Sequence, residues 1–229
     1  MQKDKNLIEL FNVTRTYQVD TKTKNALDNV SLSFPSRGLI GVIGKSGSGK
    51  STLLNVMALL DKPTSGEILF DGDDIKKWKE KRKRKYRHTD IGMIFQHYNL
   101  VENETVMYNI MLPCFIKGMK YKEAENKAKT LLDSISFKKE LYEQRVFNLS
   151  GGEKQRVAIL RALINDPKVI FADEPTGALD SRNSFLIMKN LKKISQGKLV
   201  IVVSHNLVLI EKFADKIISL KDGKVYERK

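Results

Sequence analysis

Residues 44–51 read GKSGSGKS and combine three glycines with two lysines and three serine hydroxyl groups. The apolar run GLIGVI precedes them and STLLNVM follows, so they are expected to join a strand to a helix. In that setting backbone N–H groups close around phosphate oxygens, Lys50 reaches the terminal phosphates, and Ser51 supplies an oxygen to Mg²⁺. The segment predicts a nucleotide-phosphate site of the Walker A type.

Two adjacent carboxylates, Asp173 and Glu174, follow the apolar run VIFA in KVIFADEP. Open α/β sheets bind ligands at the carboxyl ends of their strands, which is where this pair is expected. We predict that Asp173 holds Mg²⁺ through water and that Glu174 orients and deprotonates an attacking water. A lone aspartate would indicate a kinase or a switch GTPase instead, so the pair favours nucleotide hydrolysis.

A second anion site is predicted by LSGGEKQR at residues 149–156, where a serine and two glycines stand at the start of a helix. A helix start presents unpaired N–H groups and a partial positive charge. The chain therefore carries two separate elements suited to phosphate.

The strands that must position these residues fall into two classes. LIELFNV, VSLSF and EILFDGDDI alternate apolar and polar residues, which predicts half-buried strands of an antiparallel sheet with a turn at Asp71 and Gly72. GLIGVIG, KVIFAD and KLVIVVSH are nearly continuous apolar runs, which predicts a parallel sheet covered on both faces. The fold class is α/β.

Helices are predicted between these strands. YKEAENKAKTLLDSI places small and apolar residues on one face, and SGGEKQRVAILRALI forms a second helix that stops before Asn165. The helical face of the first consists of Ala124, Ala128, Leu131, Leu132 and Ile135. Residues from about 97 to 162 are thus expected to form a helical insertion.

Composition limits the function classes. The 229 residues are 41% apolar and carry a formal net charge of +14, which predicts one compact domain that attracts polyanions. Cys114 is the only cysteine, so no internal disulfide forms, and burial is expected for it. The start of the chain lacks the apolar core of a signal peptide, and its apolar runs are shorter than a bilayer span. We expect a soluble chain that reaches a membrane only through a partner.

Taken in order, the motifs resemble those of the ATP-binding-cassette (ABC) ATPases over almost the whole chain. They are GKSGSGKS at 44–51, LSGGEKQR at 149–156, VIFADEP at 169–175, GALD at 177–180, and His205 after a strand.

The resemblance implies one ABC ATPase domain, 1–229. Its RecA-like P-loop NTPase core would comprise 1–96 and 163–229, with an N-terminal antiparallel β-subdomain and an inserted α-helical subdomain at about 97–162. ATP and Mg²⁺ are the implied ligands. Two copies would pair head to tail, so that each LSGGE closes over the ATP held by the Walker A segment of the other.

The resemblance also implies roles for individual residues. Catalytic roles fall to Glu174, His205 and Gln96, and Mg²⁺ would be held by Ser51, Gln96 and Asp173. Nucleotide contacts would come from Tyr17, stacked on adenine, and from Gly44, Lys45, Ser46, Gly47, Ser48, Gly49, Lys50, Ser51 and Thr52. Contacts across the dimer would come from Ser150, Gly151, Gly152, Glu153 and Asp180. Ser204 and Asn206 stand where many relatives have Thr and Asp, which affects the positioning of water but not the identity of His205 as the switch residue.

Three further segments resemble the subgroup that includes MacB and LolD, the type VII mechanotransmission systems. They are STLLNVMALLDKPTSGEI at 51–68, IGMIFQHYNLVENETVMYNIMLP at 91–113 and FADEPTGALDS at 171–181. That likeness implies a transmembrane permease with a large extracytoplasmic domain, an extracytoplasmic adaptor, and a peripheral site at the cytoplasmic face of the membrane. The cargo class would be a lipoprotein, an antibiotic or an antimicrobial peptide. The alternatives are an FtsE-like cassette that controls a cell-wall hydrolase, and a soluble nucleic-acid-associated ABC ATPase. A small-molecule kinase is disfavoured, because LSGGE would have no role in it.

One segment stands outside this motif set. Residues 76–88, KKWKEKRKRKYRH, hold nine Lys or Arg, one acid and two aromatics. A solvated helix face, a surface near anionic lipid and a nucleic-acid surface all fit this composition. Nucleic acid is the least favoured of the three.

Overall fold

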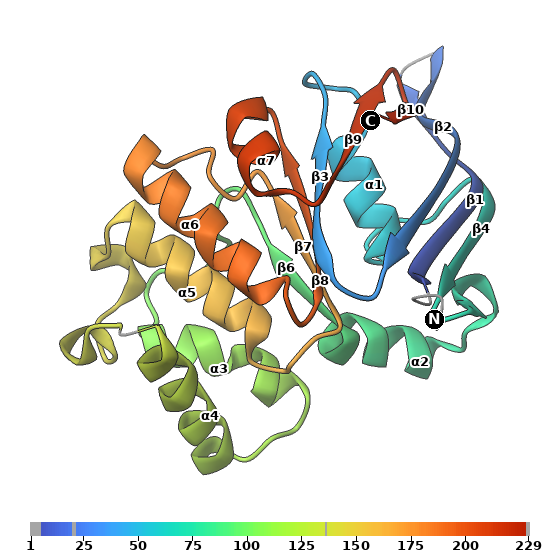
Figure 1. Cartoon of the computed structure of the whole chain (residues 1–229). Helices are drawn as coiled ribbons and strands as arrows, with labels where there is room; N and C mark the ends of the chain where they lie inside the picture. The colour runs from blue at the N-terminus through green and yellow to red at the C-terminus, as the bar shows by residue number, and fades with distance from the viewer. Residues whose placement is uncertain (1–5, 20–21, 136, 228–229) are drawn as a thin grey trace, which may run out of the picture.

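The computed structural model describes residues 6–19, 22–135 and 137–227. A six-stranded sheet lies at its centre, with every neighbouring pair parallel except the antiparallel pair β9–β10 (Figure 1). This confirms the parallel core predicted from the apolar runs. In spatial order its strands are β10 (Lys224–Glu227), β9 (Lys216–Lys221), β3 (Gly38–Ile43), β8 (Leu199–Ser204), β7 (Val169–Asp173) and β6 (Ile91–Ile94).

Both faces of this sheet are buried, because successive side chains of a strand point to opposite sides. In β7, Val169 and Phe171 pack toward helix α1 and the second sheet, whereas Ile170 and Ala172 pack toward α6 and α7. The covering helices are α1 (Lys50–Met57) on one side, and α6 (Ser181–Ile194) and α7 (Leu207–Phe213) on the other.

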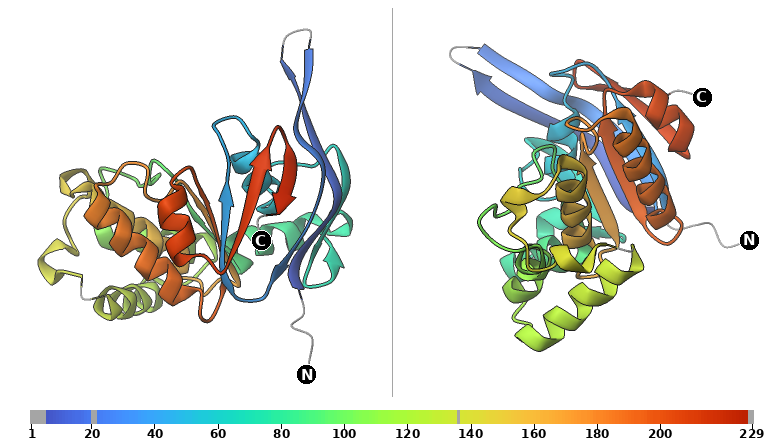
Figure 2. Two further views of the ribbon diagram at one scale, coloured as in Figure 1. Left: turned by 45° about the horizontal axis from the view of Figure 1, so that its top comes forward. Right: turned by 90° about the vertical axis from the view of Figure 1, so that its left-hand side faces the viewer.

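The second sheet is antiparallel, as the alternating patterns predict. A tight turn at Asp71 (φ 55°) and Gly72 (φ 86°) joins its last two strands. The long β1–β2 hairpin stands at one end of the molecule, away from the helical part (Figure 2). In spatial order the strands are β2 (Lys22–Pro35), β1 (Asn6–Val19), β4 (Ser65–Phe70) and β5 (Asp73–Asp74).

Three helices build a cluster with its own apolar core. α4 buries Ala124, Ala128 and Leu132 as its pattern predicts, with Leu131 and Ile135 partly buried. The cluster comprises α3 (Val106–Ile116), α4 (Tyr121–Ser134) and α5 (Gly151–Leu163), with short 3₁₀ turns at Lys139–Leu141 and Val146–Asn148. Cys114 of α3 is buried there as a free thiol. The helical subdomain is therefore present, and its boundaries at 97 and 162 remain predictions.

Residues 76–88, called the basic segment below, lie in the part of the chain that links the two sheets. This part comprises a 3₁₀ turn (Ile75–Lys77), helix α2 (Glu80–Lys85) and a π-helical turn (Tyr86–Asp90), and it leads directly into β6. Within the described ranges, the helices are all too short or too polar to cross a bilayer.

Candidate functional site

The loop after β3 and the start of α1 form the floor of a pocket of about 520 Å³, large enough for a small-molecule ligand. Gly49 caps α1 with a φ of 104°, and a Cβ there would lie 2.1 Å from the backbone oxygen of Ala26. Gly47 has a φ of 75°, again in the region that favours glycine. Only glycine lets the backbone turn this closely, which leaves the first N–H groups of α1 facing the pocket.

Lys50 is buried on this floor. Its Nζ donates to the backbone oxygens of Gly44, at 2.9 Å, and Lys45, at 3.1 Å. The ammonium group is thus held on neutral carbonyls rather than by a carboxylate, so its charge is available to an anion. Lys45 and Ser46 have exposed side chains, whereas Ser48 is buried with no hydrogen-bond partner for its Oγ among the described residues.

Asp173 ends β7 and accepts a 3.2 Å hydrogen bond from the Oγ of Ser51. Burial raises the pKa of Asp173 and the neighbouring Glu174 adds to this, whereas Ser51 and Lys50 oppose it. A partly buried carboxylate beside a hydroxyl group is a pair of hard oxygen donors suited to Mg²⁺.

Glu174 follows with a φ of 46°, a strained conformation for a non-glycine residue. Its Oε2 lies 3.0 Å from Nδ1 of His205, and the His205 backbone N–H lies 3.4 Å from the same oxygen. The Glu174 side chain is 13% exposed and that of His205 is 69% exposed. Gln96, which follows β6, has an exposed side chain on the same pocket.

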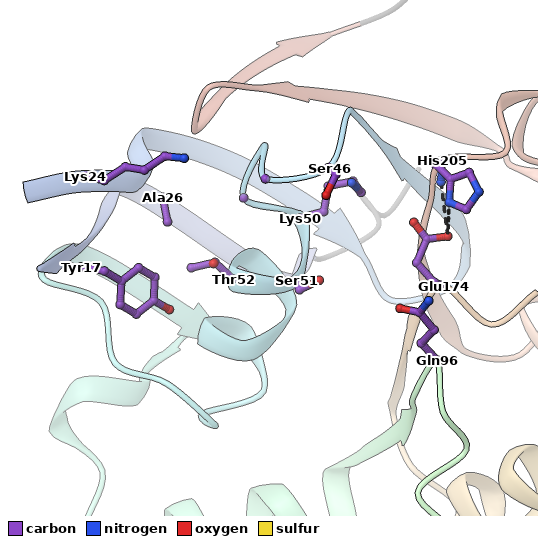
Figure 3. A pocket seen from close by; sticks show the side chains of 12 residues that line it. Tyr17, Lys24, Ala26, Ser46, Lys50, Ser51, Thr52, Gln96, Glu174 and His205 are labelled. Carbon is purple, nitrogen blue, oxygen red and sulfur yellow. Dashed lines mark hydrogen bonds and ion pairs between the residues drawn. The ribbon is translucent and has the colours of Figure 1, made fainter. Parts of the chain in front are cut away.

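The pocket is elongated, with Tyr17 at one end and Glu174 and His205 at the other (Figure 3). The hydroxyl of Tyr17 donates to Asp61 at 2.5 Å, and the Arg15 guanidinium lies 4.4 Å from the ring centroid. An aromatic ring has two faces, and Arg15 covers one of them. The structure thus gathers Tyr17, Ser46, Gly47, Gly49, Lys50, Ser51, Thr52, Gln96, Glu174 and His205 around one cavity.

The start of α5 does not line this pocket. Ser150 caps the helix by accepting from the Glu153 N–H, and Glu153 accepts in turn from the N–H (2.9 Å) and Oγ (2.6 Å) of Ser150. These two residues form a capping box. The hydrogen bond from Ser150 is the main reason that the pKa of Glu153 is lowered.

Asp180 caps α6 beside this helix start. It accepts from the backbone N–H of Asn183 at 2.8 Å and from its Nδ2 at 2.7 Å. A Cβ on Gly152 would lie 3.0 Å from Oδ1 of Asn183, and one on Gly151 would lie 3.2 Å from the Tyr98 hydroxyl. The second set of predicted residues therefore forms its own cluster, apart from the pocket.

Sequence reasoning missed several residues of both clusters. Lys24 and Ala26 of β2 line the pocket, and the structure places Lys24 opposite Tyr17 across the β1–β2 hairpin. Asn183 joins Gly152 to the α6 start, and its spacing of three residues from Asp180 is a helix-cap signal.

Arg161 of α5 was missed as well. Its guanidinium donates to the backbone oxygens of Tyr98, at 2.6 Å, and Asn99, which tie the loop after Gln96 to α5. No feature of the local sequence distinguishes this arginine from a solvated one.

Comparison with known proteins agrees with this geometry. The family model described as "ABC transporter" matches residues 27–177. The cassette MJ0796 of Methanocaldococcus jannaschii is 41% identical over 96% of this chain and 95% of its own length. Its dimeric solved structure superposes with a TM-score of 0.88, covering 97% of this chain and 98% of that one. A second dimeric structure of MJ0796, bound to ADP and Pi in a post-hydrolysis state, has a TM-score of 0.87.

Relatives with assigned names differ in what they serve. LolD of Wigglesworthia glossinidia brevipalpis, a lipoprotein-releasing ATP-binding protein, is 40% identical over 97% of both chains. MetN of Mannheimia succiniciproducens, a methionine import ATP-binding protein, is 40% identical over 97% of this chain, which spans 64% of its length. MacB of Chlorobaculum tepidum is 39% identical, and this chain spans 34% of it. The chain belongs to the family of ABC transporter ATP-binding domains, which are ATPases.

Proposed function

We propose that the chain hydrolyses ATP in composite sites built by two head-to-tail copies, and that this drives a membrane permease. One observation carries the proposal. The pocket holds the Walker A segment, Glu174 and His205, whereas the start of α5 with Ser150 lies outside it. Each chain then has half of each of two sites, and a second copy supplies the missing half.

At the phosphate end, Lys50 neutralises phosphate charge from the position where two carbonyls now hold it. The backbone N–H groups of residues 44–52 surround the phosphates. Tyr17 offers the ring face that Arg15 leaves open to the adenine base. These contacts orient ATP along the pocket.

Ser51 and Asp173, with Gln96, are the proposed ligands of Mg²⁺. The fit rests on the 3.2 Å Ser51–Asp173 contact and on the partly buried carboxylate, whose ionisation a cation would favour. Mg²⁺ takes few protein ligands and completes its shell with phosphates and water. When bound, it would neutralise charge on the phosphates.

The water-activating residue is Glu174, which accepts a proton from the attacking water. His205, 3.0 Å from its Oε2, orients that carboxylate and presents an exposed ring to the γ-phosphate. Gln96 lines the same end and contacts the water. The strained backbone of Glu174 keeps the carboxylate directed into the pocket.

Across the dimer, the α5 start contacts the γ-phosphate of the other copy. Ser150 and the N–H groups of Gly151 and Gly152 are the proposed contacts. Glu153 acts by holding Ser150 in the capping box, and Asp180, tied to Asn183, lies at the interface and couples the two sites.

We further propose a permease of the MacB and LolD type, with the chain bound peripherally at the cytoplasmic face of the membrane. The motifs of the chain and relatives of both names support this. The cargo class is then a lipoprotein, an antibiotic or an antimicrobial peptide, with an extracytoplasmic adaptor. Relatives named MetN favour an importer as the second candidate.

The experiment is to tag the chain, extract native membranes in mild detergent, and identify by mass spectrometry what co-purifies in stoichiometric amount. The proposal predicts a permease with few membrane helices and a large extracytoplasmic domain. A permease with many membrane helices and no such domain would support the importer instead. Ribosomal proteins or nucleic acid, without any membrane protein, would overturn the transporter assignment.

A further inference from the structure

The basic segment carries more positive charge than its neighbours neutralise. Three of its cations have acidic partners: Lys77 with Asp74, at 3.4 Å; Arg82 with Asp73, at 4.0 Å; and Lys83 with Glu80, at 3.0 Å. The other six have no ion pair among the described residues, and we refer to them as the basic surface. They are Lys76, Lys79, Lys81, Arg84, Lys85 and Arg87; all have exposed side chains except Arg87, which is half-buried.

Aromatic packing fixes the position of the segment that carries the basic surface. Tyr86 is buried between Phe70 and Trp78, with ring centroids 4.6 and 5.4 Å away, and its hydroxyl donates to the backbone oxygen of Met57 at 2.8 Å. No residue of α2 is buried. The cations of the basic surface on α2, Lys81, Arg84 and Lys85, are therefore exposed, and their mutual repulsion opposes the folded state until an anion neutralises it.

The same packing indicates which polyanion, a nucleic acid or a layer of anionic lipid headgroups, the basic surface suits better. Proteins that bind single-stranded nucleic acid combine cations with exposed aromatic rings on which bases stack. Here Tyr86 is 1% exposed, and the Arg82 guanidinium lies 4.7 Å from the Trp78 ring centroid. Trp78 is partly buried and also packs edge-on against Phe70 and Tyr86, with ring centroids 6.1 and 5.4 Å away. The aromatics of the segment are therefore engaged in packing, and what remains is a lysine-rich surface. Such a surface matches a layer of anionic headgroups.

Its position leaves the nucleotide site free. The π-helical turn ends at Asp90 and β6 begins at Ile91, so the basic segment lies at the amino end of the parallel sheet. The pocket lies at the carboxyl ends, and Figure 1 shows α2 at the lower edge and the loop after β3 at the upper edge. A bound membrane would therefore not compete with ATP for this charge.

We propose that the basic surface binds the anionic lipid headgroups of the bilayer beside which the cassette works. This inference rests on the proposed function, because only a cassette held at a membrane would use such a contact. The headgroup phosphates would neutralise the charge that the acids of the segment leave unpaired, and the contact would weaken as salt rises.

The test is co-sedimentation of the full chain with phosphatidylcholine vesicles, with and without phosphatidylglycerol. A variant combining Lys81→Gln, Arg84→Gln and Lys85→Gln should partition about 100-fold more weakly onto the anionic vesicles, because each basic residue near such a surface contributes separately. Its ATP hydrolysis should be unchanged. The matched control removes three exposed lysines on other elements, Lys122→Gln, Lys139→Gln and Lys189→Gln, and should keep most of the binding.

Equal losses in the two triple variants would overturn the proposal, since net charge alone would then explain the binding. So would the absence of wild-type binding to phosphatidylglycerol vesicles, or a tighter binding to single-stranded RNA that only the α2 variant loses. These failures are distinct from failure of the proposed function. If the chain hydrolyses ATP and co-purifies with its permease but does not bind anionic vesicles, only the proposed lipid contact is wrong.

Discussion

Lys50 is the single side chain whose removal should most directly weaken ATP binding. It is 8% exposed and held by two carbonyl oxygens rather than by a carboxylate, so its charge is available to a phosphate group. Lys50→Ala should weaken ATP binding by at least about tenfold, since a charge-assisted hydrogen bond contributes that much or more. Isothermal titration calorimetry measures the loss.

Lys122→Ala is the matched control for Lys50→Ala. The Lys122 side chain is exposed on α4 and does not line the pocket, so ATP affinity should stay within about twofold of the wild type. Equal losses in the two variants, or no loss in Lys50→Ala, would contradict the assigned phosphate contact.

Site residues were predictable from the sequence where the chemistry fixes both the residue type and the spacing along the chain. A phosphate loop needs glycines, a lysine and a hydroxyl in order, so the motif alone assigns Lys50 and Ser51 to the phosphate site. Lys24 and Arg161 could not be assigned in this way. Lys24 reaches the pocket only through the register of the β1–β2 hairpin, and Arg161 donates to carbonyl oxygens of residues 98–99, more than sixty positions away in sequence. A single sequence does not record such pairings.

At the scale of elements, the start of α5 depends on the Ser150–Glu153 capping box. Ser150→Ala removes the side chain that accepts from the Glu153 N–H, and should lower the free energy of unfolding by about 1 kcal/mol at pH 7. The pKa of Glu153 is lowered in the folded state, chiefly by the Ser150 hydrogen bond. Its contribution is therefore present above the unfolded pKa of about 4.3 and is lost as the pH falls through the folded value.

Urea unfolding of the wild type and Ser150→Ala across this pH range tests the cap. The difference between them should shrink on acidification below about pH 4. Ser181→Ala is the control, because Ser181 is exposed at the first position of α6, where Asp180 is the residue that caps the helix. A difference that does not change with pH would assign the stability to something other than the ionised Glu153.

Elements were predictable where burial gives a strong pattern. The parallel strands β3, β7 and β8 are buried on both faces, so their apolar runs are unbroken. The β9–β10 hairpin was not predicted, although Asp222 (φ 49°) and Gly223 (φ 76°) form its turn; its apolar run is short and lies between Lys216 and Lys221. Helix α3 contains Pro113, which local rules place outside helices. Burial of its apolar face holds it together, and Asn165 donates to the Pro113 carbonyl at 3.1 Å.

At the scale of the whole molecule, the two helix starts that the sequence predicts as anion sites lie in separate places: one lines the pocket and the other is the start of α5. Two such helix starts in one chain exceed what one nucleotide needs, which is why the proposed function invokes a second copy. The permease was less predictable. Relatives of about equal identity serve import and lipoprotein release, so the nucleotide machinery does not identify the cargo.

The proposed head-to-tail arrangement predicts how the chain assembles. Glu174→Gln keeps the shape of the side chain and an oxygen that can accept a hydrogen bond from His205, but a carboxamide cannot take a proton from water. ATP should then bind without being hydrolysed, and size-exclusion chromatography with light scattering in saturating ATP and Mg²⁺ should show a stable dimer.

Adding Ser150→Arg should abolish that dimer, because the arginine fills the space of the other copy's γ-phosphate. The ATP affinity of the monomer should stay within about twofold. A Glu174→Gln chain that remains monomeric in ATP would contradict the composite site, and loss of monomer ATP binding in the double variant would place Ser150 in its own chain's pocket.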